Sequence, residues 1–228
     1  MIRSSRTASA SRRLAWLGLA VALAAPFAQA ADHCVSTLGR GWPPATENHG
    51  SAVEQLLAAK TEPRLTLTYL PTRGTESGLL LIAGVGASDW TLRHATPNER
   101  VAVWNSGRAS GALQLRVDQK VDNEEAPIPA ALAQRVVAAW KRALASAAPQ
   151  DKPAEFQDKD QLLFVVDGLR VSGVRPDCGV GETLMRQASL LTEAANESAS
   201  KRERRWRQLG ESLDELDKQL AEASAPAR

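Results

Sequence analysis

Residues 161–178 constrain the fold of this chain more than any other stretch. Two apolar runs, 161–166 and 169–174, flank Asp167-Gly168, and an Asp-Gly pair between such runs predicts a two-residue hairpin turn with positive φ at both positions. Such a turn gives the hairpin one wholly apolar face and one half-buried face. The predicted pairs on the apolar face are Val166 with Leu169, Phe164 with Val171 and Leu162 with Gly173.

The first 30 residues have the features of a cleaved secretory signal peptide. Several arginines precede an apolar run at 14–27, which ends at an A-x-A cleavage sequence at 28–30. The run is too short to span a membrane as a helix. Arg12-Arg13 resembles part of a twin-arginine export motif, but Ala15 departs from it, so the general secretory route is favoured. We therefore predict a periplasmic or secreted bacterial envelope protein without a transmembrane segment in the mature chain.

The charge balance and the cysteines follow from this prediction. The chain has 28 basic and 26 acidic side chains, and removal of the four arginines of the signal leaves 24 basic against 26 acidic. The mature chain is thus not basic, which argues against a nucleic-acid partner. Its two cysteines, Cys34 and Cys178, predict one disulfide in an oxidising compartment. A free Cys178 activated by the start of the following helix is the alternative.

The remaining patterns predict an α+β fold in a single disulfide-locked domain over 31–195. A short helix is expected at 51–60 with Ser51 and Glu54 as a capping box, and an amphipathic helix at 129–147. Together with a helix at 181–195, the second of these is expected to cover an antiparallel sheet made of the C-terminal hairpin and a meander. The acidic residues 122–126 are expected to form a break after the meander. The five predicted meander strands are 64–70, 79–83, 89–95, 100–105 and 112–121.

Residues 196–228 are expected to form a helical C-terminal extension. Its apolar residues are spaced 3, 4, 3 and 4 apart, which is the a/d pattern of a coiled coil over about two heptads. The polar residues 196–200 predict either a break in the helix or a solvated stalk. We interpret the apolar seam as a surface for self-association or for an envelope partner. The seam consists of Trp206, Leu209, Leu213, Leu216 and Leu220.

Catalytic motifs of the common hydrolases, nucleotide-binding folds and zinc enzymes are absent from the sequence. No catalytic residue is assigned, and the sequence favours a non-enzymatic binding or interaction module. The alternative is an unrecognised hydrolase with a site near His94 and Ser110, with Asp118 as a third member.

A second alternative concerns metal binding, although no cofactor is otherwise indicated. Cleavage after residue 30 would leave Ala31, Asp32 and His33 as the first three mature residues. This arrangement resembles the amino-terminal copper- and nickel-binding motif of albumins. The α-amine, two amides and the imidazole offer four nitrogens in the square-planar geometry that Cu(II) and Ni(II) prefer.

Overall fold

The computed structural model describes residues 34, 36–84, 86, 90–105 and 112–224, which belong to one compact unit beginning at Cys34. Its fold is α+β, as predicted. The helices are α1 (Glu47–Ala58), α2 (Ala130–Ala147), α3 (Gly179–Asn196) and α4 (Ala199–Ser224). The strands are β1 (Gly39–Arg40), β2 (Leu65–Leu70), β3 (Ser77–Ala83), β4 (Trp90–Pro97), β5 (Ala102–Asn105), β6 (Ala112–Leu115), β7 (Val121–Pro127), β8 (Gln161–Val166) and β9 (Leu169–Val174).

Seven strands form one antiparallel sheet in the order β1-β9-β8-β2-β3-β4-β7. The β8–β9 hairpin has the predicted register, and Asp167 and Gly168 have φ values of 46° and 82°. The first strand of the meander, β2, pairs with β8, so the C-terminal hairpin inserts between the meander and the amino-terminal strand β1. This pairing joins the two halves of the chain in a single sheet.

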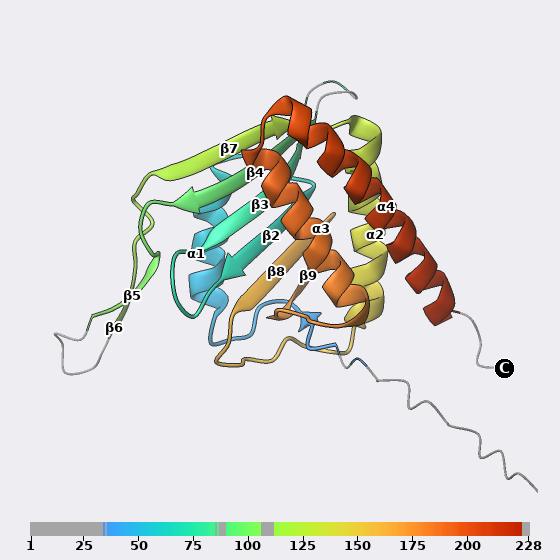
Figure 1. Cartoon of the computed structure of the whole chain (residues 1–228). Helices are drawn as coiled ribbons and strands as arrows, with labels where there is room; N and C mark the ends of the chain where they lie inside the picture. The colour runs from blue at the N-terminus through green and yellow to red at the C-terminus, as the bar shows by residue number, and fades with distance from the viewer. Residues whose placement is uncertain (1–33, 35, 85, 87–89, 106–111, 225–228) are drawn as a thin grey trace, which may run out of the picture. The chain divides into compact units, whose positions relative to one another are not determined.

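The sheet is covered on both faces, as Figure 1 shows, with α1 behind it and α3 crossing in front. On β2, Leu65 and Leu67 face the helices α2–α4, whereas Thr66 and Thr68 face the opposite side. Both threonines are buried, although the alternating pattern predicts a half-buried strand. The reason is α1, which packs a second apolar cluster around Val53 and Leu57 against the sheet.

Two predictions about the middle of the chain are wrong. The strands near 100–105 and 112–121 do not join the main sheet, because β5 and β6 pair only with each other as a separate two-stranded ribbon. The acidic segment 122–126 is not a break but part of β7, which pairs with β4 along its whole length. Only Ala126 of β7 is well buried. Backbone hydrogen bonds therefore define this edge strand, and its side chains show little apolar pattern.

Helix boundaries also differ from the sequence prediction at α1. The helix begins at Glu47, four residues before the expected cap, so Ser51 lies inside it and the predicted capping box is wrong. Helix α2 agrees with the prediction, since it starts directly after Pro129, a residue that favours the first turn. Its Trp140 is fully buried, lies edge-on to Phe164 at 5.7 Å and donates a hydrogen bond to Gln187 of α3.

The disulfide is present between Cys34 and Cys178, whose Cα atoms are 5.8 Å apart across a sequence separation of 144. It ties the amino-terminal segment to the residue that caps α3. Closure of so long a loop stabilises the folded state by up to about 5 kcal/mol in the chain-entropy description. No helix among the described residues has the length and apolar character needed to cross a membrane.

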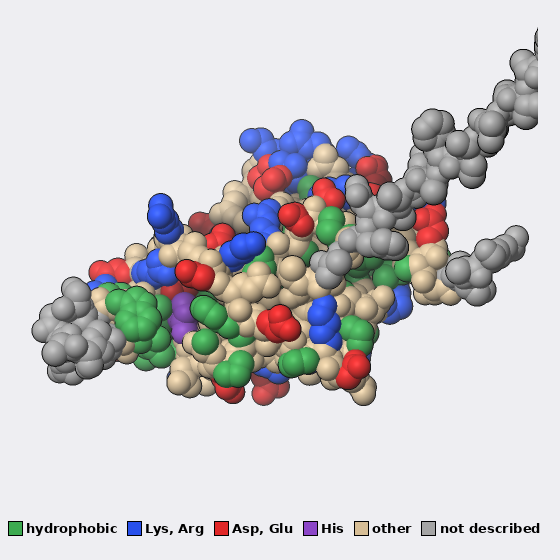
Figure 2. All heavy atoms as spheres, turned by 90° about the horizontal axis from the view of Figure 1, so that it is seen from below, with side chains coloured by type: hydrophobic (Ala, Val, Ile, Leu, Met, Phe, Trp, Pro, Cys, Tyr) green, Lys and Arg blue, Asp and Glu red, His purple; other side chains and the backbone are tan. Residues whose placement is uncertain are grey.

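Exposed apolar side chains gather on the β5–β6 ribbon. Trp104 of β5 and Leu113 of β6 are directly opposite each other, with 70% and 39% of their surfaces exposed. Figure 2 shows hydrophobic side chains at this end of the molecule, beside the residues drawn in grey. The ribbon thus differs from the main sheet, whose large apolar side chains are covered by helices.

Candidate functional site

A cavity of about 370 Å³ lies between α3 and the sheet, over β2, β3, β4 and β8. Its floor is apolar and consists of Leu67, Leu79 and Leu162, which alternate with residues on the other face of their strands. Helix α3 forms the roof with a row of residues spaced one helical turn apart. The row consists of Met185, Ala188, Ser189, Thr192 and Glu193. Most of these side chains are small, which leaves the helix and the sheet separated at this point.

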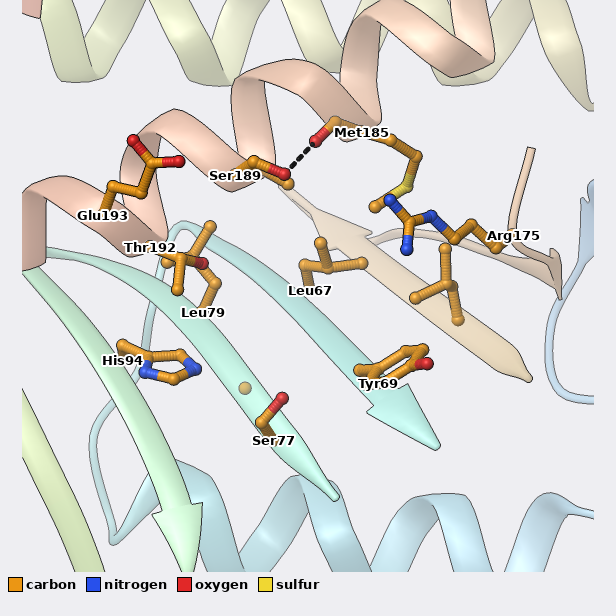
Figure 3. A pocket seen from close by; sticks show the side chains of 13 residues that line it. Leu67, Tyr69, Ser77, Leu79, His94, Arg175, Met185, Ser189, Thr192 and Glu193 are labelled. Carbon is orange, nitrogen blue, oxygen red and sulfur yellow. Dashed lines mark hydrogen bonds between the residues drawn. The ribbon is translucent and has the colours of Figure 1, made fainter. Parts of the chain in front are cut away.

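Figure 3 shows that His94 and Arg175 lie at opposite ends of the cavity, with Leu67 and Leu79 between them. His94 comes from β4, and Arg175 follows the end of β9. Ser77 and Tyr69 line the sheet side, and Ser189 already donates a hydrogen bond to the Met185 carbonyl of its own helix. The cavity thus combines an apolar middle with polar groups at both ends.

The imidazole of His94 has no hydrogen bond to another described residue. Burial lowers its pKa, and the carboxylate of Glu124, directly opposite on β7, raises it by less. The net shift is downward, so the ring is neutral at pH 7 and carries one donor and one acceptor nitrogen. This end of the cavity therefore offers hydrogen bonds without a positive charge.

At the other end, Tyr69 and Asp160 form a short hydrogen-bonded unit. The Tyr69 hydroxyl donates to Asp160 at 2.5 Å, and the same carboxylate accepts hydrogen bonds from the amide and the hydroxyl of Thr72. Burial and the hydrogen bond to this carboxylate raise the pKa of Tyr69 to about 12. The hydrogen bonds from Tyr69 and Thr72 lower the pKa of Asp160. The phenol is therefore neutral and the carboxylate is charged and already occupied by donors.

No carboxylate among the described residues lies within ion-pair distance of Arg175. Its guanidinium also donates no hydrogen bond to a described residue. It lies in the short segment between β9 and α3, three residues before Cys178. Arg175 is exposed and lines one end of the cavity, and the neighbouring buried Pro176 and the disulfide at Cys178 hold this segment. The carboxylate of Glu193, on the roof, is paired with Arg205 of α4 at 2.8 Å.

The predicted interaction seam of α4 lies elsewhere and is not an exposed surface. Leu209, Leu213 and Leu216 are fully buried against α2 and α3, and Trp206 and Leu220 pack partly buried at the margin of the same core. The spacing correctly predicts one apolar face, but the chain's own helices pack against it. The assignment of these three leucines to a partner surface is therefore wrong, whereas contact of a partner with the partly exposed Trp206 and Leu220 stays a prediction.

The described helices are separate where the sequence allowed a break, since α3 ends at Asn196 and α4 begins at Ala199. Helix α4 folds back against α3 and does not project as a stalk (Figure 1). Arg202 donates to the carbonyls of Ala194 and Glu197, which caps the end of α3. Ion pairs also join α4 to α2, where Arg135 contacts Asp214 and Asp217.

The residues suggested for a hydrolase are not brought together among the described parts of the chain. His94 lines the cavity. Asp118 follows the ribbon, is exposed and forms no hydrogen bond with His94. Ser110 lies outside the described residues. Ala31, Asp32 and His33 also lie outside the described residues, so metal binding at the mature amino terminus stays a prediction. Within the described residues, no three His, Cys, Asp or Glu side chains cluster in a way that could hold a metal ion.

Sequence reasoning missed most of the cavity. The row of small and polar residues on α3 follows helical spacing and was open to detection, because it departs from the leucine face that packs on the core. Arg175 carries no pattern, since it is a single arginine in a connecting segment. Comparisons with protein-family models, with curated proteins and with solved structures found no match for this chain.

Proposed function

We propose that this chain is an exported, non-enzymatic binding module that holds a small ligand with an apolar body between α3 and the sheet. The observation that carries the proposal is the cavity of about 370 Å³, with an apolar floor and polar groups at its ends. Ligand sites in proteins are commonly concave, mostly apolar and supplied with a few placed polar groups. The volume falls in the range of such sites.

Binding is favoured over turnover by the state of the polar groups. The Ser189 hydroxyl is bonded to its own helix, the Tyr69 phenol is held neutral, and His94 makes no hydrogen bond to a described hydroxyl or carboxylate. A nucleophile activated by a base would need such a contact. The described cavity residues thus offer recognition and no assembled acid–base pair.

Export is supported by the amino-terminal sequence and by the disulfide. The arginine-rich start, the apolar run and the A-x-A sequence at 28–30 favour the general secretory route. A disulfide such as Cys34–Cys178 is typical of proteins that fold in an oxidising compartment. We place the protein in the periplasm or outside the cell on these two grounds.

The experiment is a fluorescence titration with N-phenyl-1-naphthylamine, an uncharged apolar probe. We expect saturable binding to the wild-type chain and at least tenfold weaker binding to Ser189→Phe, which would place a bulky ring at the exposed edge of the cavity roof. Ser200→Phe, at an exposed helical serine outside the cavity lining, is the matched control and should bind like wild type. Equal binding by all three proteins, or no binding by wild type, would contradict the proposal.

A further inference from the structure

Arg175 is a cationic residue of the cavity lining, and its guanidinium donors make no hydrogen bond to the described residues. The Asp160 carboxylate is near enough to influence Arg175 electrostatically, but it lies more than 4 Å from the guanidinium and already accepts hydrogen bonds from Tyr69 and Thr72. Glu193 lies toward the opposite end of the cavity and pairs with Arg205. A guanidinium has five donor hydrogens arranged to fit two oxygens of one acidic group. Arg175 can therefore accept an anionic group from a ligand without losing an existing ion pair.

The apolar part of the cavity begins directly beside this cation. Met185 lies next to Arg175 in Figure 3, and the floor continues over Leu67 to Leu79. Methionine adapts its shape to different apolar partners. A ligand that placed an acidic group at Arg175 would thus direct any attached hydrocarbon along the floor toward His94.

The His94 end is unsuited to an anion. Its imidazole is neutral because burial lowers its pKa, and the exposed carboxylate of Glu124 lies directly across from it on β7. A negative group placed there would be repelled by Glu124 and would gain no opposite charge. Arg175 supplies a positive charge at one end, with the engaged Asp160 carboxylate near it, whereas the His94 end supplies none. This difference favours an anionic group at the Arg175 end.

We infer that the ligand is an anionic amphiphile, with a carboxylate or phosphate head at Arg175 and a hydrocarbon tail over Leu67 and Leu79 toward His94. The inference rests on the proposed function of the cavity and adds the chemical class and the orientation of the ligand. Both head groups present oxygens that suit a guanidinium, so the experiment compares them directly.

The test is displacement of N-phenyl-1-naphthylamine from the full chain by decanoate, decyl phosphate, decanol and decyltrimethylammonium. We expect at least one of the two anions to displace the probe at a concentration about tenfold below that of decanol, as a charge-assisted hydrogen bond gives. The cation should be weaker than decanol. A preference for decanoate would assign a carboxylate head, and a preference for decyl phosphate would assign a phosphate head.

Arg175→Gln should remove the tenfold advantage of the anion and leave displacement by decanol unchanged. Arg207→Gln, at an exposed arginine of α4 outside the cavity lining, is the matched control and should keep the advantage. Unfolding midpoints of both variants should equal that of wild type, because Arg175 makes no ion pair with the described residues.

Two results would overturn the inference while leaving the proposed function intact. One is equal displacement by decanol and by both anions, and the other is retention of the anion advantage in Arg175→Gln. In both cases the probe still binds the cavity. Failure of the probe to bind wild type would instead contradict the proposed function, and the inference with it.

Discussion

Two tryptophans show how differently the main sheet and the β5–β6 ribbon are built. Trp140 of α2 is fully buried, packs edge-on against Phe164 and donates its indole hydrogen to Gln187 at 2.7 Å. Trp104 of β5 is 70% exposed and lies directly opposite Leu113 of the paired strand. The first region is a core enclosed by helices, and the second is a two-stranded ribbon, which is too small to enclose a core of its own. Position in the sequence or residue type would not separate the two side chains.

One buried carboxylate, at the point where the ribbon begins, explains how the ribbon is held to the rest of the domain. Glu76, just before β3, is fully buried, and its carboxylate accepts hydrogen bonds from the amides of Val101 and Ala102 at 2.8 and 3.2 Å. The same carboxylate contacts the His49 imidazole of α1 at 2.8 Å. One side chain thus joins the helix, the sheet and the start of β5. A buried carboxylate is stable only with such partners.

Removal of the buried tryptophan should have the largest effect. Trp140→Ala would leave a cavity beside Phe164 and leave Gln187 without the indole donor, so we expect a loss of about 3–5 kcal/mol in the free energy of unfolding. Urea unfolding followed by circular dichroism measures the loss. A cost below about 1 kcal/mol would contradict the packing described for α2, α3 and β8.

Neutralising the buried carboxylate of Glu76 should have an intermediate effect on the free energy of unfolding. Glu76→Gln weakens charge-assisted hydrogen bonds, so we expect a loss of about 2 kcal/mol at pH 7. Burial alone raises the pKa of Glu76, but the hydrogen bonds from His49, Val101 and Ala102 outweigh it, and the net pKa is below the ordinary value of 4.5.

The pH dependence of that loss sharpens the prediction. A carboxyl group with a lowered folded pKa contributes stability above its unfolded pKa, and the contribution disappears as the pH falls through the folded pKa. The difference between wild type and Glu76→Gln should therefore be full at pH 7 and shrink progressively below about pH 4.5. Unfolding midpoints across this pH range measure it. A difference that stays constant from pH 7 to pH 3 would contradict the role given to the Glu76 charge.

The exposed tryptophan should have the smallest effect. Trp104→Ser removes a side chain that is mostly in water, so the free energy of unfolding should change by no more than about 0.5 kcal/mol. The urea titration used for Trp140→Ala serves as the direct comparison. A loss comparable to that of Trp140→Ala would mean that the ribbon tryptophan is covered in solution.

Several local features were predictable because neighbours in the sequence decide them. The β8–β9 register follows from Asp167-Gly168, since a two-residue turn with positive φ permits only one pairing. Helix α2 follows from Pro129 and the apolar stripe after it. The disulfide is predicted on other grounds, from the presence of two cysteines and an amino terminus whose composition predicts export.

Other features depended on contacts between distant residues. The acidic strand β7 has no apolar pattern, so only its backbone pairing with β4 makes it a strand. An apolar seam such as that of α4 fits a foreign helix as well as the chain's own helices, and its spacing cannot distinguish the two. The cavity has the same origin, because His94, Arg175 and the row on α3 are far apart in the sequence.

The sequence by itself determined the hairpin turn, the main amphipathic helix and the α+β class, since each depends on backbone preference or local periodicity. It also determined the cysteine pairing, because the chain has only two cysteines. Only the tertiary structure decided that α4 closes the core, that β5 and β6 leave the main sheet, and that small residues of α3 stand over Leu67 and Leu79. The physical reason is that burial is a property of the assembled surfaces. Periodicity in the sequence predicts which residues share a face, and only the tertiary structure determines what packs against that face.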